Sequence, residues 1–279
     1  MLTIPHLESH ISHVCNLTCE GCSDFTNHGY SEIMSVDTLE EWFSLWNKRI
    51  YPKEFALLGG EPLLNPNLIE ILYMTQRMWP RRDGDLKLEL VTNGLLIPKW
   101  PDLGRILRDT EFRLTISLHG DKNNIPYKKR MKKSFDIVNK WIKEYKIDVS
   151  MEPSVGSWRR IYKGFGITSE PYEDGSPEES WNNCHCEQDC FQLHAKNLYK
   201  CPPIAYLPLL KKKYGPLLSE KWDPYLKYIP LTPDCSDEEI VEFFNRKCES
   251  VCGMCPKNVI TFKKNDPLLP VSYYEKLQK

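Results

Sequence analysis

Apolar runs alternate with amphipathic segments along the first 170 residues. Short apolar runs that end in glycine or polar residues predict strands at 9–14, 54–60, 86–94, 112–120, 147–153 and 159–171. Apolar residues three and four positions apart predict helices at 35–50, 67–79, 102–109 and 131–146. Strands and helices that alternate every ~30 residues are typical of βαβ units with a parallel sheet.

Residues that could bind a ligand or take part in a reaction follow the ends of these predicted strands. They are Cys15, the run Gly59-Gly60-Glu61, Thr92-Asn93, Ser117 with His119, and Glu152. In a parallel barrel the carboxyl ends of the strands form the rim where active sites lie. The pattern therefore predicts an α/β fold, a partial (β/α)6 TIM-like barrel with its site at that rim.

The alternation stops near residue 170. The stretch that follows is polar, contains proline and glycine, and is rich in cysteine; only 236–247 predicts a further helix. We therefore expect a barrel domain over 1–170 and a small irregular cysteine-rich domain over 171–279.

Composition and charge exclude some classes of protein. The formal net charge is −1, so no overall attraction to nucleic acid or to an acidic membrane is expected. No apolar run is long enough to span a membrane, and the start of the chain lacks the features of a signal peptide. We expect a cytoplasmic protein.

The number and placement of the cysteines indicate metal binding or thiol chemistry. There are 11, an odd number, and in a cytoplasmic protein they favour metal binding or chemistry over disulfides. Three lie at Cys15, Cys19 and Cys22, and the other eight fall between Cys184 and Cys255. The two ends of the chain therefore need thiols, and the middle does not.

The first group has the spacing C-x3-C-x2-C. Three thiolates from one loop can hold a [4Fe–4S] cluster and leave its fourth iron open to another ligand. Two alternatives are a structural zinc, with His13 or His28 as the fourth ligand, and cysteines that are simply buried. The spacing alone does not decide between them.

This spacing after a first strand, with Gly59-Gly60-Glu61-Pro62 after the second, resembles the radical S-adenosylmethionine (SAM) superfamily. The resemblance covers roughly residues 8–170. It implies that Cys15, Cys19 and Cys22 hold three irons and that SAM chelates the fourth through its amino and carboxylate groups. Many members have an aromatic residue just before the third cysteine, where this chain has Gly21.

The resemblance also implies how SAM is held. Gly59, Gly60, Glu61 and Pro62 match the motif that receives the SAM amino group, and Ser117 matches a position that meets its ribose or carboxylate. Asn93 is expected on the same rim, near the adenosine or the substrate. Ser117 and Asn93 could also be ordinary polar residues at the start of loops. An electron from the cluster would split SAM into methionine and a 5′-deoxyadenosyl radical that takes hydrogen from a substrate.

The second group of cysteines resembles the SPASM and twitch extensions of radical SAM enzymes, which carry auxiliary clusters. Cys190 and Cys201 flank a predicted hairpin, and Cys252 and Cys255 close the group. The resemblance implies one auxiliary [4Fe–4S] cluster held by these four residues. A second auxiliary cluster, a zinc site or a redox dithiol are alternatives, and the remaining cysteines available as ligands are Cys184, Cys186, Cys235 and Cys248.

We therefore expect a radical SAM enzyme that acts on a small molecule, sugar- or nucleotide-like, or on a peptide, with a flavodoxin or ferredoxin as reductant. One alternative is an enzyme that activates a glycyl radical on a protein partner. Another is a non-catalytic iron–sulfur or zinc protein that binds nucleic acid through the basic run 126–133. A solvated first turn of a helix is the simpler interpretation of that run.

Overall fold

Seven strands form one sheet in the order β5-β4-β3-β2-β1-β6-β7 in the computed structural model, which describes residues 1–80, 86–184, 190–263, 267–268 and 270. β1 to β6 are joined by parallel pairing, and β7 is antiparallel to β6. The strands are β1 (Leu2–Ser12), β2 (Ile50–Gly59), β3 (Lys87–Thr92), β4 (Phe112–Leu118), β5 (Val149–Pro153), β6 (Gln192–His194) and β7 (Asn197–Tyr199). The predicted α/β fold with a parallel sheet is confirmed.

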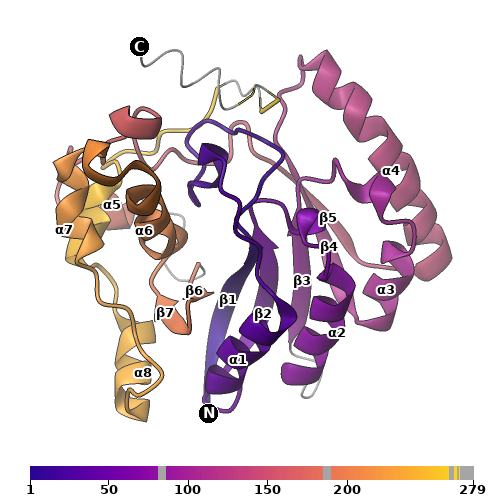
Figure 1. Ribbon diagram of the computed structural model, residues 1–279, viewed down its shortest axis with the longest axis horizontal. Coiled ribbons are helices and arrows are strands. Elements are labelled where there is room, and N and C mark those ends of the chain that lie inside the picture. Colours follow the sequence, from indigo (N-terminus) through magenta and orange to yellow (C-terminus); the bar gives the residue numbers. More distant parts are fainter. Residues whose placement is uncertain (81–85, 185–189, 264–266, 269, 271–279) are drawn as a thin grey trace.

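Four helices follow β1 to β4 and lie along one side of the sheet (Figure 1). They are α1 (Val36–Trp46), α2 (Leu68–Met78), α3 (Leu103–Asp109) and α4 (Ile125–Tyr145). All four were predicted, but α4 begins six residues earlier than expected. Asn124 caps it, since its side chain accepts a hydrogen bond of 3.0 Å from the Tyr127 amide, and Pro126 suits a first helical turn.

The strand predicted at 159–171 is wrong. This segment forms isolated bridges, Arg159 with Thr261 and Lys163 with Glu170, and a 3-10 turn at Gly166–Thr168. Gly164 and Gly166 have φ angles of 71° and 59°, which are incompatible with an extended strand. The sixth parallel strand is β6, which pairs with β1 on the side of the sheet away from β5 and lies between β1 and β7.

The elements after β5 lie beside β1, on the side away from α4 (Figure 1). The helices are α5 (Pro177–Asn182), α6 (Pro202–Tyr214), α7 (Asp223–Leu226) and α8 (Asp237–Asn245), the last as predicted. The predicted hairpin is also present, and Lys196 occupies its turn with a φ of 72°. A glycine would be usual at this φ, but the position is held by Lys196. The Lys196 ammonium forms an ion pair with Glu41 at 2.6 Å.

Two clusters of buried apolar side chains hold the chain together. The larger lies between the sheet and its helices. The smaller joins α6, α7 and the 160–162 segment to Phe25, which belongs to the cysteine loop and is completely buried. The loop is therefore anchored by the C-terminal part of the chain. Within the described residues, no helix has the length and apolar character needed to cross a membrane.

Candidate cluster and cofactor site

A cavity of about 420 Å³ opens at the carboxyl ends of the parallel strands. Its walls bring together most of the residues that the sequence singled out for the first cluster and for SAM. These are Cys15, Cys19, Cys22, Gly59, Gly60, Asn93 and Ser117. Residues far apart in the sequence therefore meet at the predicted rim.

Each cysteine of the first loop has a different neighbour. The Cys15 Sγ lies 3.2 Å from the Gly60 carbonyl oxygen, and the Cys22 Sγ lies 3.4 Å from the Thr26 hydroxyl. The Cys19 Sγ lies 3.2 Å from the Nδ1 of His119, the residue after β4. The loop is thus fixed against the ends of two separate strands.

Burial and mutual repulsion disfavour ionised thiols in this loop. Burial raises the pKa of Cys15 well above its ordinary value, and the neighbouring Cys19 and Glu61 add to the shift. Burial also raises the pKa of Cys22 to about 11, with a contribution from Asp24. A bound cation would supply the positive charge that thiolates need in such a place.

The two glycines allow β2 to end directly against the cysteine loop. A Cβ on Gly59 would lie 2.1 Å from the Ser12 carbonyl oxygen, and a Cβ on Gly60 would lie 2.4 Å from that of Val14. The Gly60 amide donates to Ser12 at 2.7 Å. Backbone therefore forms this wall of the cavity, because no side chain fits there.

Glu61 and Pro62 lie behind that wall. The Glu61 carboxylate is completely buried and accepts hydrogen bonds from the Leu63 amide (2.9 Å), the Asn93 amide (2.9 Å) and the Thr92 hydroxyl (2.6 Å). Burial raises its pKa to about 7 against the effect of these bonds. Glu61 thus joins the ends of β2 and β3, and the glycine backbone is the part of the motif that faces the cavity.

Asn93 and Ser117 are held differently. The Asn93 side chain donates to the Asn16 side chain at 2.7 Å and accepts from the Leu95 amide at 3.1 Å. Ser117 is buried at the end of β4, beside Glu152 of β5 in the strand register. Both side chains line the cavity, so both can contact a ligand inside it.

Two histidines, His28 and His13, are considered as a fourth ligand for a zinc ion at the first cysteine group. Among the described residues, no three His, Cys, Asp or Glu side chains are placed to hold one metal ion. His28 instead contacts the Tyr214 hydroxyl at 3.0 Å, and His13 packs beside His10. In a [4Fe–4S] cluster each thiolate binds its own iron, so the three sulfurs need not converge on one point.

The rest of the cavity is acidic. Its lining contains five carboxyl groups and two guanidinium groups, namely Glu8, Asp24, Glu54, Glu89 and Glu152 with Arg113 and Arg159. Several lie on β1 to β4 at positions where barrels more often have Val, Ile or Leu. We call these residues the acidic floor. Apart from Glu152, none of them was identified from the sequence, although polar residues inside the strands, such as Glu89, were the signal for it.

The second group of cysteines gathers around a small cavity of about 40 Å³. Cys184, Cys201 and Cys255 line it. Burial raises the pKa of Cys255, and the nearby Cys184 and Cys252 raise it further. Burial also raises the pKa of Cys201 well above its ordinary value, with Cys255 as the next cause. These four thiols are therefore close enough to interact.

Cys190 lies elsewhere. It lines the large cavity with the first cysteine group, next to β6. Three of the four cysteines predicted to hold the auxiliary cluster, Cys201, Cys252 and Cys255, thus lie together, and Cys184 lies beside them. Cys248 neighbours Cys252, Cys235 accepts from Arg49 at 3.6 Å, and Cys186 falls outside the described residues.

Comparison with known proteins identifies the family of this chain. The sequence pattern of the Radical SAM superfamily matches residues 9–173. No curated protein matches the chain. Among solved structures, native anSMEcpe with bound AdoMet and Cp18Cys peptide shares 22% identity, with a TM-score of 0.39 over 53% of this chain and 42% of that one.

A second solved structure is SuiB of Streptococcus suis bound to S-adenosylmethionine. It shares 16% identity, with a TM-score of 0.43 over 80% of this chain and 68% of that one. The chain thus spans about two fifths of anSMEcpe and two thirds of SuiB. Since the superfamily pattern covers more than half of its length, this chain belongs to the radical SAM superfamily.

Proposed function

We propose that this protein reductively cleaves SAM at a [4Fe–4S] cluster and uses the resulting radical to take hydrogen from a substrate. One observation carries the proposal. Three cysteine thiols and the backbone of Gly59 and Gly60 line the same cavity, although 37 positions separate Cys22 from Gly59 in the numbering. That cavity offers both the cluster ligands and a place for SAM.

Each group of residues has its own role in this proposal. Cys15, Cys19 and Cys22 hold three irons, and the backbone of Gly59 and Gly60 receives the SAM amino group. When bound, the cluster supplies the electron that splits SAM into methionine and the 5′-deoxyadenosyl radical. The cavity walls hold the substrate against the radical and exclude water.

The acidic floor of the cavity limits the classes of substrate that we propose. Carboxylates accept hydrogen bonds and attract cations, whereas they repel phosphate. The excess of carboxyl groups over guanidinium groups therefore favours a substrate with hydroxyl, amide or amine groups, such as a sugar or a peptide. It disfavours a nucleotide, one of the classes that the sequence analysis left open.

An auxiliary [4Fe–4S] cluster completes the proposal. Its ligands are Cys201, Cys252 and Cys255, as the resemblance implied, with Cys184 as the fourth. Support comes from the shared cavity and from the effects of these thiols on one another's pKa. Because Cys235 contacts Arg49 instead, a single auxiliary cluster is the simpler assignment.

The test is the formation of 5′-deoxyadenosine from SAM. Protein reconstituted without oxygen and reduced with dithionite should form the nucleoside. A Cys15→Ala, Cys19→Ala, Cys22→Ala variant should form none. If iron-loaded wild-type protein forms none with or without sugar and peptide candidates, the proposal fails and a binding role takes its place.

A further inference from the structure

The first turns of α4 carry an exposed cationic surface. We define the basic surface as Lys128, Lys129, Arg130, Lys132 and Lys133, all of which are exposed. Within the described part of the chain, none of them forms an ion pair. Since the whole chain has a net charge of −1, this positive patch is a local feature.

An apolar tip adjoins the basic surface. Ile125 begins α4 with 74% of its surface exposed, and the next residue, Pro126, is exposed too. A small apolar contact beside unpaired charges suits a transient protein complex, in which charge steers the encounter. The positive end of the helix dipole adds to the same potential.

A short path connects this surface to a cluster ligand. Tyr127, between Pro126 and Lys128, is buried, and its hydroxyl accepts a hydrogen bond of 2.9 Å from the His119 amide. The His119 Nδ1 lies 3.2 Å from the Cys19 Sγ. The basic surface is therefore two residues away from the proposed SAM-binding cluster.

We propose that the basic surface docks an acidic one-electron carrier protein that reduces the cluster held by Cys15, Cys19 and Cys22. This inference rests on the proposed function. One electron leaves the carrier's reduced cofactor, which is oxidised by one electron, and the cluster is reduced by that electron. No atom is transferred. The carrier's acidic face meets the five cations, and its cofactor approaches Ile125 and Pro126.

Nucleic acid fits this surface less well. The five cations occupy less than two helical turns, which is a small footprint for a duplex. An acidic protein avoids this difficulty, because it needs only a compact patch.

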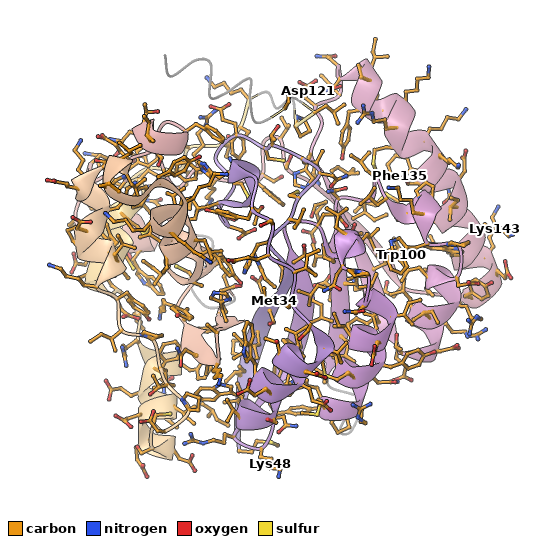
Figure 2. All side chains as sticks on the ribbon, viewed as in Figure 1. Met34, Lys48, Trp100, Asp121, Phe135 and Lys143 are labelled. Atoms are coloured by element: carbon orange, nitrogen blue, oxygen red, sulfur yellow. The ribbon has the colours of Figure 1, made fainter. Side chains whose placement is uncertain are left out.

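The experiment compares two charge reversals on the same helix. The test variant carries Lys128→Glu and Lys129→Glu, and the matched control carries Lys140→Glu and Lys143→Glu. Each pair changes the charge equally at exposed sites, but Lys143 lies at the far end of α4, whereas Asp121 marks the end near the basic surface (Figure 2). 5′-Deoxyadenosine formation is measured with reduced flavodoxin and, separately, with dithionite.

With flavodoxin at low salt, the test variant should be about 10-fold slower than wild type, and the difference should shrink at high salt. With dithionite its rate should equal that of wild type, and the control should stay within about twofold of wild type with either reductant. Equal rates with flavodoxin for wild type and test variant would overturn the proposal, as would equal losses in both variants.

Other outcomes separate this inference from the function on which it rests. If wild type forms no 5′-deoxyadenosine even with dithionite, the proposed function itself fails. If the test variant also loses its activity with dithionite, calorimetric binding of oxidised flavodoxin decides, and unchanged affinity overturns the docking site. Tight binding of a DNA duplex that only the test variant loses, with flavodoxin unaffected, would assign the surface to nucleic acid.

Discussion

The Sγ of Cys15 lies 3.2 Å from the carbonyl oxygen of Gly60, although the two residues belong to different strand–loop junctions. This contact joins the first proposed iron ligand to the proposed SAM motif. It depends on the absence of a side chain at residue 60, where a Cβ would lie 2.4 Å from the Val14 carbonyl oxygen and 3.0 Å from the Cys15 Cβ. Ligand and motif are thus positioned as one unit.

Gly60→Ala should therefore weaken SAM binding. The methyl group must displace Val14 or Cys15, so we expect at least a 10-fold loss of SAM affinity and a fall of about 1–3 kcal/mol in the free energy of unfolding. Calorimetric titration with SAM and urea unfolding measure the two effects. Gly253→Ala is the control, because its φ is not positive and the nearest atom to its added Cβ lies at 3.6 Å, an ordinary contact. Unchanged SAM affinity in Gly60→Ala would contradict the assignment.

Cys184→Ala and Cys190→Ala should differ in iron content. Two [4Fe–4S] clusters give about eight irons per chain, and loss of the auxiliary cluster leaves about four. Since Cys184 shares the second cavity with Cys201 and Cys255, Cys184→Ala should lose iron toward the lower value. Cys190→Ala should keep the wild-type content, because Cys190 lines the other cavity.

Iron analysis and the optical spectrum after identical reconstitution measure this difference. The opposite pattern, with iron lost only from Cys190→Ala, would restore the ligand set that the sequence implied. Each variant serves as the control for the other, since both remove one partly exposed thiol from the same segment of the chain.

Phe25→Ala should loosen the cysteine loop. Phe25 is completely buried against Tyr162 and Trp222, at ring distances of 5.0 and 6.0 Å, so its loss should lower the free energy of unfolding by about 3–5 kcal/mol. Iron at the first site should fall as well. Phe112→Ala is the matched control, because Phe112 is also buried, with 2% of its surface exposed, but lies at the start of β4. Equal iron content in the two variants would show that Phe25 has no special link to the loop.

Acid should destabilise the protein through buried His28. Burial lowers its pKa to about 3, with a smaller contribution from nearby Lys213. Below the ordinary histidine pKa the unfolded chain binds a proton that folded His28 does not, so stability falls as the pH falls from 6.5 toward 3. Removing this group should make that fall shallower.

His28→Phe tests this prediction. The variant loses the 3.0 Å contact with the Tyr214 hydroxyl, so it should be less stable than wild type at pH 8 by about 1 kcal/mol. Between pH 7 and 4.5 it should lose roughly 2–3 kcal/mol less than wild type. Urea unfolding at several pH values gives both numbers, and parallel curves for the two proteins would contradict the buried neutral state.

Much of the fold could be predicted because its signals are local. The apolar runs and helical periodicity identified β2 to β5 and the four barrel helices, and the spacing of Cys15, Cys19 and Cys22 indicated the first site. The errors also have local causes. Gly164 and Gly166 interrupt an apparently suitable strand with positive φ angles, and the cap at Asn124 starts α4 earlier than its apolar pattern does.

What the sequence determined by itself was the repeat of strands and helices from β2 to β5 and the thiols that lie before and after it. Only the tertiary structure decided which of those thiols meet. Cys184 and Cys190 are six positions apart, yet they face different cavities, because β6 pairs with β1 and brings Cys190 to the barrel. Spacing along a chain limits which residues can meet, but the pairing of strands selects among the arrangements that remain.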